Sequence, residues 1–292
     1  MIREMLKEKQ EIINHRLGEL LVPDRKEHKT LYDAMNYSLL AGGKRIRPFL
    51  LLTVLEVLGK DSAPYVDAAC ALECIHTYSL IHDDLPAMDN DDYRRGRLTN
   101  HKVFGAGMAT QAGDGLLTFA FQLLAEDPHI PEEIKPRLIS IAARAAGPAG
   151  MVGGQAHDME SENRDLSLAE LKILDASKTG CLLAAPVEMA AVLAGAGEED
   201  RKALADFASH LGLLFQITDD LLDEKGNLEE MGKMPGQDEK DHKSTFVTIL
   251  GADKAQHYAE EEAAKAKEAL GRLSRSADVL AELVDLMVNR KK

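Results

Sequence analysis

The sequence predicts an all-α protein on three observations. Apolar residues recur at helical spacing through most of the 292 residues. The chain has no Trp and only 4% aromatic residues, so its core must consist mainly of Leu, Ala, Ile, Val and Met, which favours packed helices over sheets. No linker separates two compositions, and no repeat is visible in the sequence. We therefore expect a single helical domain over residues 1–292.

Five helices are expected in the N-terminal half. Their ranges are 2–21, 29–41, 49–58, 63–82 and 103–125. Local signals agree with these limits, because Pro23 ends the first helix and the Gly42-Gly43 pair suits the C-terminal cap of the second. Pro48 suits the first turn of the third.

The C-terminal half shows the same pattern after a proline-rich break at residues 128–136. Helices are expected over 134–146, 168–180, 182–194 and 206–222, and again from Thr245 to the end. Pro186 predicts a kink within its apolar stretch. Residues 223–245 are the most polar part of the chain and suit either an ordered lid or a flexible loop.

A cluster of aspartates ends the apolar helix expected at 63–82. Five of the ten residues from 83 to 92 are aspartates, and Arg94 and Arg95 follow. Hard divalent cations such as Mg²⁺ prefer oxygen ligands, and adjacent arginines suggest an anion that meets the same metal. Metal-bridged phosphate fits both charges, and a solvated acidic turn is the alternative that the cluster alone leaves open.

A second cluster ends another apolar helix and contains Asp219, Asp220 and Asp223. Asp219 and Asp223 are four residues apart, so they share one helix face, where like charges are unfavourable without a cation between them. Two such clusters more than a hundred residues apart suggest a metal site shared between facing helices.

Basic residues mark two candidate anion sites. Lys44, Arg45 and Arg47 lie in a tight connection that leads into a helix N-terminus, although an ordinary basic loop has the same composition. Lys178 and the Thr179 hydroxyl beside Gly180 suggest a phosphate contact, with a lysine at a helix C-terminus as the alternative. His76 is two turns before Asp83, about 10 Å along the axis.

Overall charge and cysteine usage restrict the class of protein. The net charge of −14 argues against a nucleic-acid surface and against an anionic membrane patch. Cys70 and Cys74 are one helical turn apart and are expected to be core thiols. The first residues contain no apolar signal core, and no uncharged apolar run reaches the roughly 18 residues of a membrane span. These features predict a reduced, soluble, cytoplasmic protein without a stable membrane anchor.

Taken together, five motifs resemble those of the short-chain trans-prenyl diphosphate synthases over about residues 30–250. The motifs are Gly42–Pro48, Asp83-Asp84-x₄-Asp89 with Arg94-Arg95-Gly96, Gly153-Gly154-Gln155, Lys178-Thr179-Gly180, and Phe215-Gln216-x₂-Asp219-Asp220-x₂-Asp223. The resemblance implies an all-α bundle around a deep central cavity, usually a homodimer. It also implies that the two aspartate motifs face each other across the cavity mouth.

The resemblance further implies roles for individual residues. Up to three Mg²⁺ ions, with Mn²⁺ as an alternative, would be held by Asp83, Asp89 and Asp219 and supported less directly by Asp84, Asp220 and Asp223. The allylic diphosphate would be bound by Arg94, Lys178 and Lys233, with Thr179 and Gln216 lining its site. Isopentenyl diphosphate would be bound by Lys44, Arg47, His76 and Arg95.

The position of Tyr78 on its helix predicts the length of the product. Tyr78 is five residues before Asp83, about 7.5 Å deeper along the helix, so its ring would form the floor of the pocket beside the small Ser79. Within the family this pattern resembles the bacterial type that makes the C15 product farnesyl diphosphate from isopentenyl and dimethylallyl or geranyl diphosphate. Leu98 and the Thr110-Gln111 pair depart from the family pattern and leave geranyl (C10) and geranylgeranyl (C20) diphosphate open as products.

Three other classes are less favoured. A terpene cyclase would normally lack the Gly42–Arg47 motif and carry a different second metal motif. A calcium-binding module would need glycine where Arg94 stands. A catalytically silent partner subunit would not be expected to retain every ligand.

Overall fold

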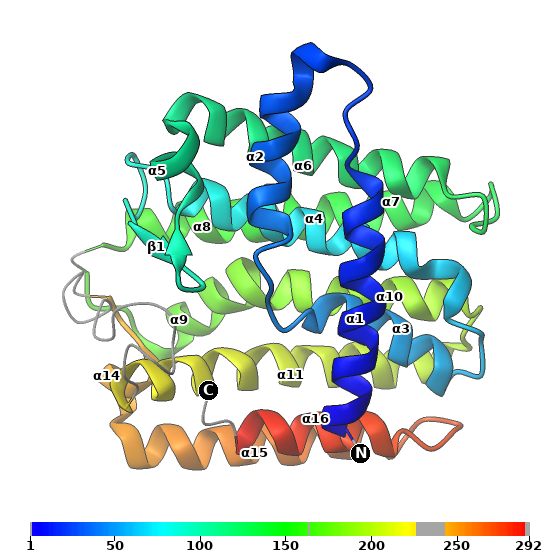
Figure 1. The fold of residues 1–292 in the computed structure, drawn as a ribbon. Coiled ribbons are helices and arrows are strands. Elements are labelled where there is room, and N and C mark those ends of the chain that lie inside the picture. Colours follow the sequence, from blue (N-terminus) through cyan, green and yellow to red (C-terminus); the bar gives the residue numbers. More distant parts are fainter. Residues whose placement is uncertain (1, 163, 226–242, 290–292) are drawn as a thin grey trace. The chain divides into compact units, whose positions relative to one another are not determined.

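The computed structural model describes residues 2–162, 164–225 and 243–289 (Figure 1). These residues are mostly helical, and the strands among them are the short antiparallel pair β1 (Tyr93–Arg94) and β2 (Arg97–Leu98). The expected all-α class is therefore confirmed. The chain divides into two compact units, Met1–Leu52 with Ser62–Ile139 and Thr53–Asp61 with Ser140–Lys292. The single domain and its central cavity stay predictions.

Unit 1 is built around one buried helix. Its helices are α1 (Ile2–Leu20), η1 (Lys26–His28), α2 (Lys29–Leu39), η2 (Ala63–Tyr65), α4 (Val66–Asp83), α5 (Asn100–Phe104) and α6 (Ala106–Glu126). α4 packs against α1, α2 and α6, and every residue from Ala68 to Ile75 is buried. The aspartate motif therefore begins at the end of the central helix of this unit, whose packing limits where the carboxylates can lie.

The helix expected over 103–125 is interrupted at Gly105, which is a correction to the sequence prediction. α5 ends at Phe104 and α6 begins at Ala106 because Gly105 has φ 84° and ψ 152°. This conformation is favourable only for glycine and turns the chain sharply between the two helices.

Unit 2 contains the second aspartate motif on its longest helix. Its helices are α8 (Met151–Glu160), α9 (Leu168–Asp175), η3 (Ala176–Gly180), α10 (Cys181–Leu193), α11 (Glu198–Lys225), α14 (Phe246–Leu250), α15 (Ala252–Leu270) and α16 (Asp278–Val288). α11 lies side by side with α15 (Figure 1). Two further helices, α3 (Ile46–Val57) and α7 (Lys135–Ala146), begin in unit 1 and end in unit 2.

The helix expected to end at Gly180 continues instead. α9 passes through the π-helical turn η3 into α10, and Pro186 lies inside α10. The stretch Leu168–Leu193 is long enough and, with a mean hydropathy of 1.2 in its most apolar window, apolar enough to cross a membrane by length and composition alone. Half of that window is buried inside the protein, as in the core helix of a folded domain.

Candidate active site

The first aspartate motif forms a compact loop at the end of α4. The backbone N–H of Asp89 donates to the carbonyl of Asp83 over 2.9 Å, which brings the first and last aspartates of the motif to the same end of the helix. The described residues contain no preformed cluster of three or more His, Cys, Asp or Glu side chains able to hold a metal. The carboxylate-rich loop that this hydrogen bond closes fits Mg²⁺, which proteins usually bind through one or two carboxylates together with substrate phosphates and water.

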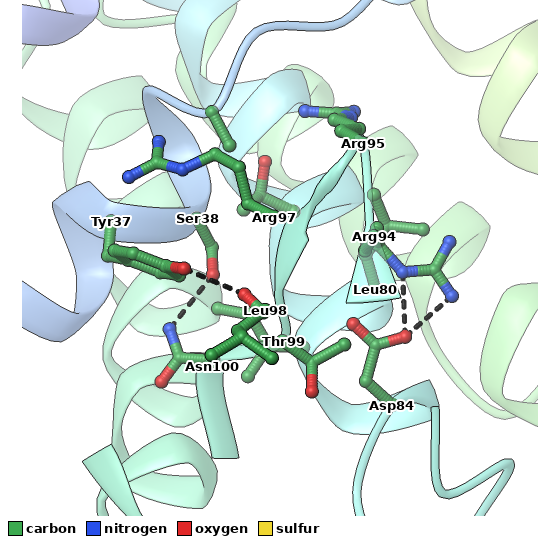
Figure 2. A pocket seen from close by; sticks show the side chains of 13 residues that line it. Tyr37, Ser38, Leu80, Asp84, Arg94, Arg95, Arg97, Leu98, Thr99 and Asn100 are labelled. Atoms are coloured by element: carbon green, nitrogen blue, oxygen red, sulfur yellow. Dashed lines mark hydrogen bonds and ion pairs between the residues drawn. The ribbon is translucent and has the colours of Figure 1, made fainter. Parts of the chain in front are cut away.

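The middle aspartate of the motif has a different environment. Asp84 is 3% exposed, and its Oδ1 accepts from Arg94 Nε at 2.7 Å and pairs with Arg94 Nη2 at 2.6 Å (Figure 2). Burial raises the pKa of the Asp84 carboxyl, and the guanidinium of Arg94 partly offsets that rise. Asp84 therefore holds Arg94 beside the motif, and its expected place behind the metal ligands stays a prediction.

A group of cations, Arg47, His76 and Arg95, gathers near α4, because Arg47 and Arg95 are among the charges that act on His76 of that helix. The guanidinium of Arg95 donates to the carbonyl of Gly42. A Cβ at Gly43, where φ is 126°, would lie 2.7 Å from Arg95 Cζ. Both glycines of the loop have positive φ, so the Gly42-Gly43 pair lets the arginine approach the backbone closely.

The cations of this group lack sufficient negative charge around them. Burial lowers the pKa of Arg47 to about 10, with Glu73 opposing and Arg95 adding to the shift. Burial and the neighbouring Arg47 and Arg95 also hold the pKa of His76 well below its ordinary value. Among the described residues, none accepts a hydrogen bond from the buried Arg47 Nε. Such a group favours a bound anion, as expected of a diphosphate site.

Arg45 does not belong to this anion site, contrary to the interpretation of the basic loop. It is 2% exposed, and its Nη1 lies 2.5 Å from Glu73 Oε1. Its Nε donates to Asn14 Oδ1 at 2.9 Å and its Nη2 to the carbonyl of Leu39 at 2.7 Å. Arg45 therefore ties α1, α2 and α4 together. Sequence reasoning gave Glu73 no role, although an acidic residue within an otherwise apolar buried helix was a usable signal.

Lys44, the remaining cation expected at the isopentenyl diphosphate site, is exposed in the same loop as Arg45.

Tyr78 and Ser79 precede the aspartate motif on α4, and Tyr78 is 5% exposed. Burial, with a smaller contribution from the charge of Asp83, raises the pKa of Tyr78 to about 12. The Ser79 hydroxyl donates to the carbonyl of His76 at 2.9 Å. The buried ring agrees with the expected floor of a pocket, and the role itself stays a prediction.

In unit 2, the π-helical turn presents Lys178 and Thr179. Lys178 Nζ lies 2.6 Å from Asp158 Oδ2 on α8. A Cβ at Gly154, one turn earlier on α8, would lie 2.3 Å from the backbone nitrogen of Lys178, so only glycine permits this approach. Asp158 Oδ2 is also 3.8 Å from Lys243 Nζ. The role of Asp158 was missed because its partners are distant in sequence.

The side chains of the second aspartate motif differ in their contacts and in their exposure. The Thr179 hydroxyl donates to Gln216 Oε1 at 3.3 Å, and Gln216 Nε2 donates to Asp220 Oδ1 at 2.9 Å. Asp220 Oδ2 accepts from the backbone N–H of Phe246 at 2.8 Å, which fixes the start of α14. Asp219 is partly exposed and Asp223 is buried. Lys233 lies outside the described residues.

Comparison with known proteins identifies a family. The family model described as polyprenyl synthetase matches residues 28–287. Farnesyl diphosphate synthase from Geobacillus stearothermophilus is 52% identical over 266 residues, covering 89% of this chain and 88% of that protein. Farnesyl diphosphate synthase from Bacillus subtilis is 48% identical with 89% of both chains covered. A crystal structure of geranyltransferase from Helicobacter pylori, complexed with magnesium and isoprenyl diphosphate, aligns with a TM-score of 0.87 at 34% identity over 98% of this chain and 96% of that chain.

Proposed function

This chain belongs to the polyprenyl synthetase family, and we propose how its residues condense isopentenyl diphosphate with an allylic diphosphate to give farnesyl diphosphate. The main support for the roles that we propose for its residues comes from two features of unit 1. An underneutralised cation group (Arg47, His76 and Arg95) lies near α4, and its member His76 is about two turns before the oxygen-rich aspartate loop at the end of that helix. One binds an anion directly and the other through a metal, as two diphosphate substrates require.

The reaction breaks the allylic C–O bond and forms a C–C bond to the double bond of isopentenyl diphosphate. A proton is then lost, and we assign it to the released diphosphate rather than to a side chain. When bound, Mg²⁺ supplies Lewis-acid stabilisation of the departing diphosphate. Asp83 and Asp89 would hold two ions and Asp219 a third, with Asp84, Asp220 and Asp223 in support.

The side chains orient the two substrates and exclude water. Lys44, Arg47, His76 and Arg95 bind isopentenyl diphosphate, while Arg94 and Lys178 neutralise the allylic diphosphate, with Thr179, Gln216 and Lys233 completing that site. Asp84 and Asp158 hold the two cations Arg94 and Lys178 in place before substrate arrives. That both units contribute to one allylic site stays a prediction, as do the homodimer and the cytoplasmic location.

One incubation tests the function. The purified protein is mixed with Mg²⁺, isopentenyl diphosphate and dimethylallyl diphosphate, and the dephosphorylated alcohols are identified by mass. A C15 alcohol is expected. A C10 or C20 alcohol would keep the chemistry and overturn the argument from Tyr78. Absence of condensation with both dimethylallyl and geranyl starters would contradict the proposal.

Replacing the ring at the pocket floor should lengthen the product. Tyr78→Ala is expected to shift the product from C15 toward C20, because removing a buried ring next to Asp83 leaves room for one more isoprene unit. Gas chromatography of the alcohols measures the shift. Tyr65→Ala is the control, because Tyr65 is also buried (6% exposed) but precedes the other end of α4. An unchanged C15 product from Tyr78→Ala would contradict the floor.

A further prediction concerns Arg95, which has a strained backbone and which we expect to bind isopentenyl diphosphate. It has φ 53° and precedes Gly96 in the two-residue turn between β1 and β2, where Asn is better tolerated than Arg. Burial also lowers the pKa of Arg95, so the environment disfavours its charge. Arg95→Asn relieves up to about 1 kcal/mol of backbone strain but loses the hydrogen bond from the guanidinium to the Gly42 carbonyl, so the free energy of unfolding should change little or fall slightly.

The same change should raise the KM for isopentenyl diphosphate by roughly 10- to 100-fold, the value of a hydrogen bond to a charged group. Steady-state kinetics and thermal unfolding measure the two effects. Arg97→Asn, at an exposed position of the same ribbon, serves as the control. An unchanged KM for Arg95→Asn would remove Arg95 from the isopentenyl site.

A further inference from the structure

α4 presents different side chains to its two sides, and the side against α6 carries an aromatic pair. Tyr78 and His82 are four residues apart, and their rings meet edge to face with centroids 5.6 Å apart and planes at 80°. His76 and Glu73 belong to the cation side described above. Tyr78, the expected floor of the product pocket, therefore has an aromatic neighbour between it and the aspartate loop.

His82 is fixed against α6, which packs extensively on α4. Its Nε2 lies 3.1 Å from the main-chain carbonyl of Thr110. Because a carbonyl can only accept, Nε2 carries the proton and the ring has one orientation. Asp114 Oδ1 lies 3.8 Å from the same nitrogen. Thr110, Gly113 and Asp114 together form what we call the histidine seat.

The seat requires glycine at position 113. A Cβ built there would lie 2.1 Å from His82 Nε2 and 2.4 Å from Cδ2, distances that no real contact shows. Any other residue would therefore push the imidazole off α6. The Thr110 side chain is not part of the seat, because its hydroxyl donates to the carbonyl of Ala106 in its own helix at 3.0 Å. The departure from the family pattern at Thr110 thus leaves the seat intact.

We propose that His82, held by the histidine seat, is a positioning residue that fixes the Tyr78 ring and thereby limits product length. The inference rests on the proposed function. Tyr78 has a single ring on a flexible Cα–Cβ bond, and an edge-to-face neighbour restricts the orientations that the ring adopts. With His82 displaced, the Tyr78 ring turns aside more easily and the growing chain passes it.

The test compares product ratios, which do not depend on total turnover. His82→Asn keeps a donor for the Thr110 carbonyl but removes the ring, and Gly113→Ala displaces the ring without changing α4. Both are expected to raise the C20:C15 ratio by about twofold to tenfold, the range that one aromatic pair can impose. Gly107→Ala on the same helix is the matched control, because a Cβ there meets nothing within 4 Å. It should leave the ratio unchanged.

The outcomes separate this inference from the proposed function. Wild-type protein that makes no prenyl product contradicts the function itself. The role of His82 alone is overturned if the wild-type protein makes the C15 product and Tyr78→Ala raises the C20:C15 ratio, but neither His82→Asn nor Gly113→Ala changes that ratio. The role of His82 is also overturned if Gly113→Ala raises the C20:C15 ratio and His82→Asn does not, because Gly113 would then affect product length without acting through His82. Circular dichroism shows whether each variant is folded. If either His82→Asn or Gly113→Ala is unfolded, the product ratio of the folded one of the two tests the role of His82.

Discussion

Asp83→Asn is expected to lose nearly all prenyl transfer while the protein stays folded. Asp83 ends α4 and lies beside Asp84, so removing its charge relieves repulsion at the negative end of a helix. The same change removes an oxygen ligand whose charge Mg²⁺ needs. Loss of one group that stabilises developing charge typically lowers the turnover number by about 100- to 1,000-fold. Steady-state rates at saturating Mg²⁺ measure the effect.

Asp92→Asn is the matched control for that experiment. Asp92 belongs to the same acidic run, is exposed, and pairs with Lys102 at 2.6 Å, so it has its own partner outside the proposed metal site. It should keep nearly normal turnover. Near-normal turnover of Asp83→Asn at saturating Mg²⁺ would remove Asp83 from the metal site, and a large loss in both variants would point to the loop as a whole.

Glu73→Gln is expected to cause the largest loss of stability. The Arg45–Glu73 pair has side-chain exposures of 1% and 2%, so removing the carboxylate charge leaves a buried guanidinium uncompensated. Breaking such a pair costs about 3–5 kcal/mol. The substitution keeps the shape of the side chain, so the loss reports charge rather than a cavity. Thermal or denaturant unfolding measures the effect.

Two further variants make the experiment decisive. Glu188→Gln breaks an exposed pair with Arg144, whose Nη2 lies 2.9 Å from Glu188 Oε2, and should change stability far less because solvent screens it. The double variant Arg45→Met with Glu73→Leu replaces both charges by apolar side chains and should recover much of the loss. Equal unfolding midpoints for Glu73→Gln and Glu188→Gln would show that the buried pair is not a main support of unit 1.

Most helices and both aspartate motifs were predictable from the sequence, because each depends on residues close together in the chain. Periodic apolar residues predicted α1 and α2 to within two residues at each end. The sequence did not predict α8, and it placed the start of α11 eight residues too late. Two further predictions were wrong because one residue or one turn changed the path. Gly105 separates α5 from α6, and the π-helical turn at 176–180 joins α9 to α10.

Composition and local spacing are enough to predict the fold class, the two carboxylate clusters and the basic loop. They do not distinguish the charged residues that serve binding from those that serve the fold, and the packing of the helices does. Arg45 and Arg47 are two residues apart, yet Arg45 is neutralised by Glu73, 28 residues away, while Arg47 stays short of negative charge.

The same is true of unit 2, where Asp158 meets Lys178 across 20 residues and Asp220 meets Phe246 across 26. This is so because the charge state and role of a buried polar group depend on the partners that folding brings to it. Those partners come from other helices, so no local pattern records them.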